Sequence, residues 1–312
     1  MKIPITQSEK WQKLQDDLGE KSYFEASPDF QYLAIKKHTP IGNYLYLPYG
    51  PVSDTSSGFK KAIKSLEGLA KATSAIFIRI EPRMVKEAEI LALGGKKEQG
   101  IKAVKKSKDM SPKETWLLDL TGTDDDLKAK LPSRLLRYYR NREKQGITIE
   151  TSRSPEDIHY LLDLQKSLAR EKGISTFSEA YLKTELSQPF ATLYIVRQNN
   201  KVLAAGLVFD DDTTRYNLQG AQSDEGRKLH ATGILTIQLI LDAKAKGQQI
   251  FDFWGIAPDG APANHPWAGF TAFKKTFLGY EATFAGTHDL VLNPTKYRLY
   301  SLLRKLRYLA HN

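Results

Sequence analysis

FDFWGIAPDGAPANHPWAGFTAFKKTFLGY, at Phe251–Tyr280, places two lysines among aromatic side chains. The apolar run Ile250–Trp254 predicts a buried strand, which ends at Gly255 and leads into a loop rich in proline and glycine. Lys274 and Lys275 follow this loop in an aromatic-rich segment. An ammonium group among aromatic rings loses hydration, so its charge is expelled to water, paired, or used on an anion that arrives during a reaction. The ordinary alternative is that both lysines extend past the rings to water.

The strands and helices predicted for the rest of the sequence follow a similar order in the two halves of the chain. The second half reads as hairpin, strand, helix and buried strand, at Ala191–Arg197, Lys201–Phe209, Arg215–Gly220, Ala231–Lys246 and Ile250–Trp254. The first half reads as strand, strand, helix and strand, at Gln31–Lys37, Asn43–Tyr49, Phe59–Lys71 and Ala75–Ile80. This order, without a repeat in the sequence itself, predicts an α+β chain of two similar units in tandem.

The division between the two halves is predicted at a polar, lysine-rich segment, Gly94–Ser111, which suits a surface loop or linker. After it, Thr115–Leu120 is predicted to be a strand. Thr123 is the expected N-cap of a short helix whose first turn is acidic. We therefore expect a first domain over residues 1–108, a second over residues 109–293, and a terminal helix over residues 294–312 that joins the first domain.

The terminal helix is expected to start at Pro294, with Asn293 as its N-cap. Its leucines form an apolar stripe, and its basic residues lie mostly elsewhere: Leu299, Leu302, Leu303, Leu306 and Leu309, with Arg298, Arg304, Lys305 and Arg307. The favoured interpretation is a helix that packs back on the first domain. The alternative is a peripheral membrane contact, because anionic lipid attracts basic charge beside leucine.

The composition describes a globular protein of 312 residues, 41% hydrophobic and 26% charged, which is enough for two cores. The absence of cysteine excludes disulfides, thiolate metal sites and thiol nucleophiles. No apolar run has signal-peptide or membrane-spanning length, so we expect a cytoplasmic protein, and we expect a monomer. The formal charge of +10 favours polyanionic partners such as RNA, anionic lipid or nucleotide-linked substrates.

Basic residues concentrate on one predicted helix, Pro132–Gly146. Arg134, Arg137, Arg140 and Lys144 are spaced so that they share one helix face. Like charges at this spacing repel one another unless an anion compensates them, and the guanidinium fork suits phosphate oxygens. A basic face that is only solvated is the other interpretation, and these residues alone leave both open.

Other patterns that carry chemistry are absent from the sequence. Its histidines have no metal-ligand spacing, and it has neither a Walker loop nor a strand-linked GxGxxG. Ser167 and Ser223 lack the nucleophile-elbow motif of serine hydrolases. We therefore expect no metal and no cofactor.

Several segments, in the same order over most of the chain, resemble the Fem-type aminoacyltransferases, which build peptidoglycan interpeptide bridges. They are NYLYLPYGPV at Asn43–Val52, TWLLDLTGTDDDLKAKL and RLLRYYRNREKQGI within Thr115–Ile147, RYNLQGAQS at Arg215–Ser223, and FDFWGI with HPWAGFTAFKKTFLG within Phe251–Gly279. The resemblance implies two acetyltransferase-like (GNAT) domains in tandem. It also implies transfer of an amino acid from aminoacyl-tRNA to the stem-peptide amine of a peptidoglycan precursor, either UDP-MurNAc-pentapeptide or a lipid-linked form.

The resemblance also assigns roles to residues. Phe273 and Lys274 inherit the family's catalytic centre, where a fixed ammonium would stabilise the oxyanion formed when an amine attacks the ester carbonyl. Arg137 inherits a contact with precursor phosphates, with Arg140 and Tyr138 as near neighbours.

Two further substrate-binding assignments follow from the same resemblance. Tyr216 corresponds to a residue in the strand that lines the family's cleft. A substrate-binding lysine of the first domain corresponds to Lys36 or Lys37, because Gln31–Pro40 departs from the usual tryptophan-containing pattern. The sequence has no room between Glu179 and Ala191 for the long coiled-coil arm of some members, so it resembles the arm-less ones.

Two other functions compete with this one. An acyl-CoA-dependent N-acyltransferase of the GNAT fold would need a glycine-rich pyrophosphate loop at a helix start, and GRKLHATG at Gly226–Gly233 lacks that spacing. An RNA-binding module would use the basic helix alone and would not need Lys274.

Overall fold

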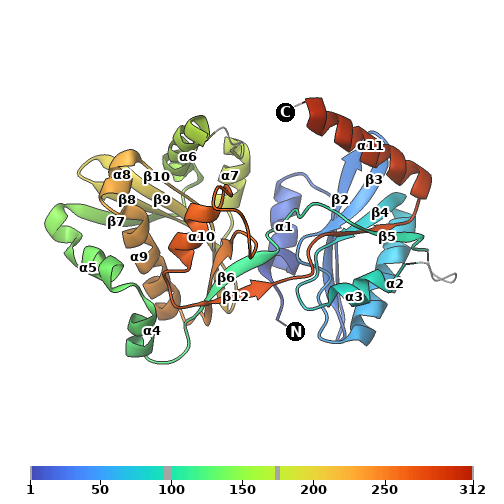
Figure 1. Ribbon diagram of the computed structural model, residues 1–312, viewed down its shortest axis with the longest axis horizontal. Coiled ribbons are helices and arrows are strands. Elements are labelled where there is room, and N and C mark those ends of the chain that lie inside the picture. Colours follow the sequence, from blue (N-terminus) through green and yellow to red (C-terminus); the bar gives the residue numbers. More distant parts are fainter. Residues whose placement is uncertain (1, 95–99, 173–175, 311–312) are drawn as a thin grey trace. The chain divides into compact units, whose positions relative to one another are not determined.

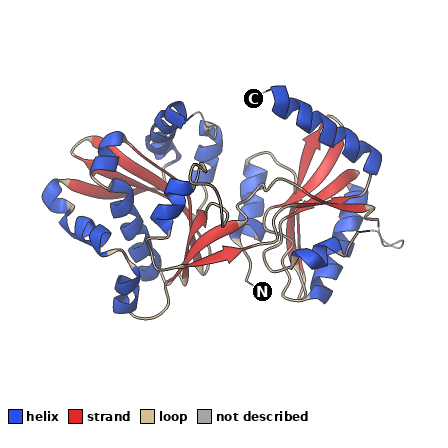
Figure 2. Cartoon of the chain, in the orientation of Figure 1, coloured by secondary structure: helices blue, strands red, loops and turns tan. Residues whose placement is uncertain are grey.

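The computed structural model describes residues 2–94, 100–172 and 176–310, and the chain divides into two compact units (Figure 1). Unit 1 comprises Met1–Lys113 and Thr283–Asn312, and unit 2 comprises Glu114–Ala282. Each unit contains one β-sheet with helices packed against it, which Figure 2 shows in red and blue.

Unit 1 is built on a six-stranded sheet with the order β1-β2-β3-β4-β13-β5. Its strands are β1 (Ser22–Ala26), β2 (Gln31–Thr39), β3 (Gly42–Leu47), β4 (Ala75–Ile80), β5 (Ala103–Lys106) and β13 (His288–Val291). The pair β3–β4 is parallel and the other paired neighbours are antiparallel. The parallel pair requires a crossover, and α2 (Ser56–Ala72) supplies it.

The helices of unit 1 cover both faces of its sheet. They are η1 (Ile5–Gln7), α1 (Glu9–Asp17), α2, α3 (Glu87–Leu91) and α11 (Pro294–Ala310). Alternate residues of β4 point to opposite faces, so Ile78 and Ile80 join the core under α2, whereas Phe77 contacts Tyr297 of α11 with ring centroids 5.2 Å apart. The terminal helix therefore packs on unit 1.

Unit 2 is built on a seven-stranded sheet with the order β12-β6-β11-β10-β9-β8-β7. Its strands are β6 (Glu114–Asp119), β7 (Ile147–Ser152), β8 (Ala191–Gln198), β9 (Lys201–Asp210), β10 (Thr214–Gln222), β11 (Ile250–Gly255) and β12 (Tyr280–Thr283). The pair β10–β11 is parallel, and α9 (Ala231–Ala245) lies in the crossover between its strands.

The helices of unit 2 pack on both faces of its sheet. They are α4 (Asp124–Lys130), α5 (Ser133–Asn141), η2 (Glu143–Gln145), η3 (Pro155–Ile158), α6 (His159–Lys172), α7 (Glu179–Leu186), α8 (Asp224–Lys228), α9 and α10 (Ala268–Lys274). The apolar residues of α9 form a core with Phe251 and Phe253 of β11, and α5 packs on the outer side of α9. On the other face, α6 contacts β9 and β10.

The two sheets share one strand topology. In each, two antiparallel strands precede a strand, a helix and a parallel strand, as β1-β2-β3-α2-β4 and as β8-β9-β10-α9-β11. The strand after the parallel pair is antiparallel to it in both sheets, β13 in unit 1 and β6 in unit 2. The repeated order of elements in the sequence therefore corresponds to a repeated architecture.

The predicted boundaries differ from the observed units in two places. The predicted linker Gly94–Ser111 contains β5, which pairs with β13, so this segment belongs to unit 1; residues 95–99 lie outside the described part of the chain. The second domain was expected to run to residue 293, but β13 pairs with β4 and β5 and completes the sheet of unit 1. Both differences arise from long-range strand pairing, which hydrophobic periodicity does not reveal.

Candidate active site

The end of β11 departs from regular strand geometry. Its pairing with β6 is irregular between Asp252 and Gly255, and Trp254 has a φ of 66°, in the left-handed region that a bulky side chain rarely adopts. The backbone N–H of Trp254 donates to Oδ1 of Asp252 at 2.8 Å, which holds this turn. A strained backbone at the end of a strand marks a candidate functional site, since the surrounding contacts must stabilise it.

The loop after β11 returns to the sheet through α10 and the segment that follows. The backbone N–H of Ala257 donates to Oγ1 of Thr271 at 2.8 Å, which ties the loop to α10. After α10, the indole of Trp116 donates to the carbonyl of Phe277 at 3.1 Å. A Cβ at Gly279 would lie 2.2 Å from the carbonyl oxygen of Leu117, so only glycine allows this close approach to β6.

The two neighbouring lysines at the end of α10 have different environments. The ammonium of Lys274 donates to the carbonyl oxygen of Gly255 at 2.6 Å, and its side chain is half-buried. Lys275 is exposed, forms a 3.2 Å ion pair with Glu281, and lies 5.5 Å from the centre of the Trp116 ring. Lys275 therefore follows the ordinary alternative of a lysine that reaches water, and Lys274 does not.

Burial alters the acidity of Lys274. Loss of hydration lowers its pKa to about 8, and the charge of Asp252 partly opposes this shift. The group stays mainly protonated at neutral pH, because its pKa still lies above 7. It is therefore a cation that has lost much of its water and is fixed to a backbone carbonyl, which is the kind of group that stabilises negative charge on an incoming substrate.

Two aromatic residues support this position. Phe273 packs against the core of unit 2 and contacts Phe277 edge to face, with ring centroids 5.6 Å apart. Tyr216 is the register partner of Asp252 in the parallel pair β10–β11, so both side chains lie on the same face of the sheet. Tyr216 is only 2% exposed and its hydroxyl donates to Asp211 at 2.6 Å, so it lies behind the site surface.

The basic helix is shorter than the sequence pattern predicts. The α-helix α5 ends at Asn141 and gives way to the turn η2, so Lys144 is not on the helix with Arg137 and Arg140. The carbonyl of Tyr139 accepts hydrogen bonds from both the backbone and the guanidinium of Arg142, which closes the last helical turn. Gly146 then takes a φ of 69°, as expected for the residue that ends the segment.

The remaining predicted residues of α5 form a surface cluster. Arg137 and Arg140 are exposed, and Tyr138 stacks on His230 with ring centroids 4.2 Å apart. Nε of Arg134 donates to the hydroxyl of Tyr138 at 3.0 Å, and this hydrogen bond lowers the pKa of that hydroxyl. Among the described side chains, no hydrogen bond or ion pair joins this cluster to Lys274. The structure thus gathers the arginines and Tyr138 at one place and Lys274 with Phe273 at another.

The two lysine alternatives of unit 1 point to opposite faces of β2, because they are adjacent in a strand. Lys37 forms a 2.7 Å ion pair with Glu20. Lys36 lies on the same face as Tyr32 and Ala34, the face that packs toward α2, and no ion-pair partner is found for it among the described residues.

Within the described ranges, no group of three or more histidine, aspartate or glutamate side chains could hold a metal ion. None of the helices described here is both long and apolar enough to cross a membrane.

Comparisons with known proteins bear on this fold and this site. The FemAB family model matches residues 185–305, which include β11, α10 and both lysines. The crystal structure of FemX matches with a TM-score of 0.79 and 19% identity, over 95% of this chain and 94% of that one. L-PGS from Bacillus licheniformis matches with a TM-score of 0.60 and 14% identity, over 100% and 99%. No curated protein matches the chain.

The fold and the family match define an aminoacyltransferase with two tandem acetyltransferase-like units, of the aminoacyl-tRNA-dependent kind. The α+β tandem architecture predicted from the sequence is confirmed. The resemblance to the Fem-type family drawn from the motifs is confirmed, by the family match over residues 185–305 and by the shared fold.

Sequence reasoning did not identify Asp252, the acid whose charge acts on Lys274. Asp252 is 1% exposed and stands between Phe251 and Phe253, in a run predicted to be a buried strand. A carboxylate in such a run is rarely buried without a partner. That isolated acid was the signal available in the sequence.

Proposed function

We propose that the protein transfers an amino acid from aminoacyl-tRNA to the stem-peptide amine of a peptidoglycan precursor. The observation that carries this proposal is the ammonium of Lys274, held by the Gly255 carbonyl at 2.6 Å within the segment that matches the FemAB family model. Acyl transfer from an ester places negative charge on the carbonyl oxygen, and a fixed, poorly hydrated cation stabilises that charge without further reorganisation.

In the proposed reaction, the acceptor amine forms a bond to the ester carbonyl carbon, and the bond between that carbon and the ribose oxygen of the tRNA breaks. The attacking nitrogen loses a proton, and the departing ribose oxygen gains one. Lys274 stabilises the tetrahedral oxyanion between these steps; losing one such donor raises the activation free energy by about 3–4 kcal/mol. Phe273 positions the end of α10 through its contact with Phe277. The reaction needs no covalent enzyme intermediate, so it needs no cysteine.

The other assigned residues would bind the precursor. Arg137 and Arg140 present exposed guanidinium groups that suit phosphate oxygens, and the hydroxyl of Tyr138 lies among them. Lys36 is a better substrate-binding lysine than Lys37, because Lys37 is already paired with Glu20. Buried Tyr216 would act by supporting the β11 end of the site.

An acyl-CoA-dependent N-acyltransferase is less well supported. The glycines of the GRKLHATG segment are explained by packing: a Cβ at Gly226 would lie 2.1 Å from the carbonyl oxygen of Leu203, and one at Gly233 would lie 2.6 Å from the side chain of Leu135. The short helix α8 in this segment has Asp224 and Glu225 in its first turn, which disfavour a pyrophosphate.

A transfer assay tests the proposal. Purified protein receives tRNAs charged with radiolabelled amino acids, and either UDP-MurNAc-pentapeptide or a lipid-linked precursor as acceptor. Label in the stem peptide supports the proposal, and the productive acceptor identifies the form of the precursor. Acetyl transfer from acetyl-CoA without any aminoacyl transfer would support the N-acyltransferase instead. RNA binding that persists in Lys274→Ala, without any transfer by the wild type, would support an RNA-binding module.

A further inference from the structure

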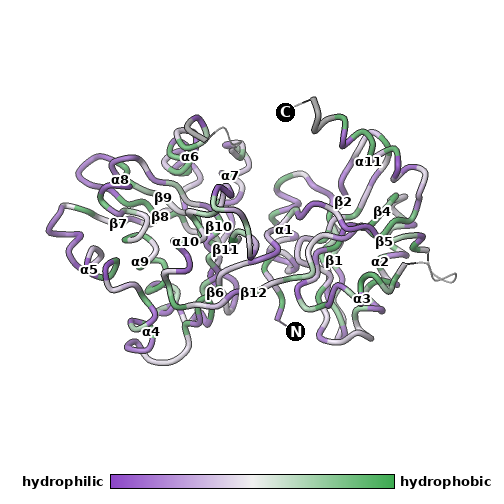
Figure 3. Tube along the Cα trace, in the orientation of Figure 1, coloured by the Kyte–Doolittle hydropathy of each residue, from purple (hydrophilic) through white to green (hydrophobic). Residues whose placement is uncertain are grey.

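The terminal helix α11 carries two residue stripes with different surroundings. Tyr297, Tyr300 and Arg304 form the first stripe and face the sheet of unit 1. Leu299, Leu302 and Leu306 repeat the same spacing two residues along, which rotates them by about 200° to the opposite side of the helix. Hydrophobic and hydrophilic residues accordingly alternate along α11 in Figure 3.

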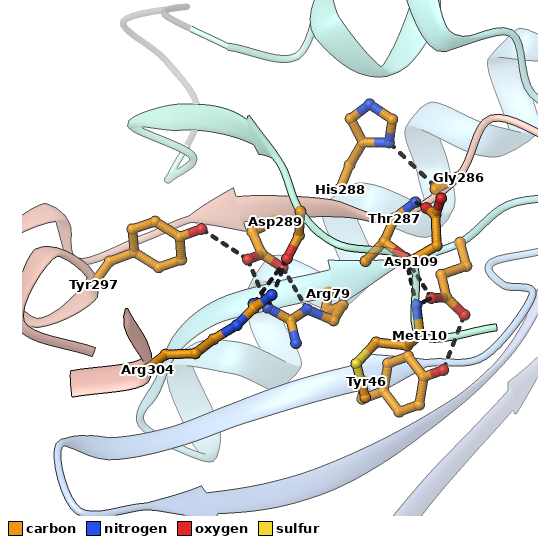
Figure 4. A network of polar contacts seen from close by, with 12 residues as sticks. Tyr46, Arg79, Asp109, Met110, Gly286, Thr287, His288, Asp289, Tyr297 and Arg304 are labelled. Atoms are coloured by element: carbon orange, nitrogen blue, oxygen red, sulfur yellow. Dashed lines mark hydrogen bonds and ion pairs between the residues drawn. The ribbon is translucent and has the colours of Figure 1, made fainter. Parts of the chain in front are cut away.

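The stripe that faces the sheet is firmly held. The hydroxyl of Tyr297 donates to Asp289 at 2.7 Å, and the rings of Tyr297 and Tyr300 contact Phe77. Arg304 donates to Oγ of Ser107 at 3.1 Å. Figure 4 shows Arg304 and Tyr297 in the polar network around Asp289. The helix therefore does not need to rotate or detach to present its other side.

The outer stripe is exposed and apolar. Leu299, Leu302 and Leu306 are 47%, 53% and 52% exposed, so three large apolar side chains in one row remain in contact with water. A row of this kind marks a surface that is covered in some functional state. Arg307 and Leu309, which the sequence also assigned to this helix, have side chains outside the described set.

Basic residues border the outer stripe on both sides. Arg298 and Lys305 immediately precede Leu299 and Leu306 and lie along one edge, and Lys296 lies along the other. All three are exposed, and none has an ion-pair partner among the described side chains. The sequence has no aspartate or glutamate after Asp289. The surface thus combines apolar side chains with uncompensated positive charge.

We propose that this surface, formed by Leu299, Leu302 and Leu306 with Lys296, Arg298 and Lys305, docks the protein on a bilayer that contains anionic lipids. The leucines would enter the headgroup boundary and the long basic side chains would reach the lipid phosphates beside them. A second copy of the chain is a poorer occupant, because pairing two such helices would bring like charges together. This inference does not depend on the reaction catalysed, since it concerns binding without substrate.

Vesicle co-sedimentation of the full chain tests the proposal. We expect the wild type to pellet with vesicles of phosphatidylcholine and phosphatidylglycerol and to bind phosphatidylcholine alone far more weakly. Leu299→Ser, Leu302→Ser and Leu306→Ser combined should lower the partition coefficient at least about tenfold. Arg298→Glu with Lys305→Glu should weaken binding and reduce its sensitivity to salt.

Matched variants control for exposure and charge. Exposed apolar residues elsewhere in unit 1, changed together as Met84→Ser, Leu91→Ser and Met110→Ser, should leave binding unchanged. Lys60→Glu with Lys64→Glu repeats the charge reversal on α2 and should have a smaller effect. Thermal unfolding of each variant shows whether it is folded.

A second measurement places the helix directly. Leu302→Trp should show a blue-shifted emission with anionic vesicles and quenching by brominated lipids, above the signal of the wild type. Failure of the wild type to pellet with anionic vesicles would overturn the proposal, as would unchanged binding by the triple leucine variant. So would a lipid-free dimer in sedimentation velocity that the triple leucine variant abolishes, because the occupant would then be a second copy.

Discussion

Lys274 donates a 2.6 Å hydrogen bond to the backbone carbonyl of Gly255, directly after the left-handed residue Trp254. The bond joins the end of α10 to the end of β11 and fixes the ammonium before any substrate arrives. Preorganised charge of this kind acts on the transition state without the cost of orienting a mobile side chain. Four predictions concern Lys274, the basic helix α5 and the buried ion pair of unit 1.

Lys274→Met is expected to lower the turnover of the transfer reaction by about 10²–10³-fold, with little change in precursor affinity. The reason is that the ammonium acts mainly on charge that develops in the transition state. Single-turnover kinetics and calorimetry separate the two quantities. Lys275→Met is the control, because Lys275 is exposed and paired with Glu281, and it should retain near-normal turnover. Equal losses in binding and turnover for Lys274→Met would contradict the assigned role.

The stability of the protein should depend on pH through Lys274. Its pKa is about 8 in the folded protein, against 10.5 for the unperturbed group, so the unfolded state binds the proton more tightly. Wild-type stability therefore rises as pH increases from about 8 to 10.5, and below pH 8 the buried charge is destabilising. At pH 7, Lys274→Met should raise the free energy of unfolding by at most about 3 kcal/mol.

Urea denaturation at pH 7 and at pH 10.5 measures this difference. The advantage of Lys274→Met over the wild type should shrink at the higher pH, whereas any effect of Lys275→Met should be the same at both. An advantage that does not change with pH would show that packing, and not the buried charge, accounts for it.

Arg137→Ala is expected to weaken precursor binding roughly tenfold and to make the affinity less sensitive to salt, because one guanidinium–phosphate contact is lost. Isothermal titration at two ionic strengths measures both effects. Arg153→Ala removes an exposed arginine from a loop of the same unit and should change neither. Unchanged affinity in Arg137→Ala would remove the phosphate role from α5.

The buried ion pair in unit 1 should contribute strongly to its stability. Nε of Arg79 lies 2.7 Å from Asp289, both side chains are nearly inaccessible, and Tyr297 donates to the same carboxylate (Figure 4). Asp289→Asn would leave the guanidinium buried without a counter-charge and should cost about 3–5 kcal/mol in chemical denaturation. Arg79→Met combined with Asp289→Leu should recover much of that loss. A cost below about 1 kcal/mol for Asp289→Asn would show that water replaces the missing charge.

Local patterns predicted the regular elements well. Ala75–Ile80 and Ala231–Ala245 are a strand and a helix almost residue for residue as their periodicity indicates, and Thr123 caps α4 with a full capping box. The elements that were missed, such as β5 and β13, are four residues long each and gain their stability from pairing with each other. Such strands carry too few residues for a periodic signal.

The sequence by itself determined the order of elements, the tandem arrangement and the motifs that identify the family, because these depend on residues close together in the chain. Only the tertiary structure decided which of the lysines Lys274 and Lys275 is held inside, and that Lys37 is paired with Glu20. The partner of Lys274 lies 19 residues away, across a loop and a helix. Burial, hydration and pKa depend on such distant contacts, so they are fixed only when the chain folds.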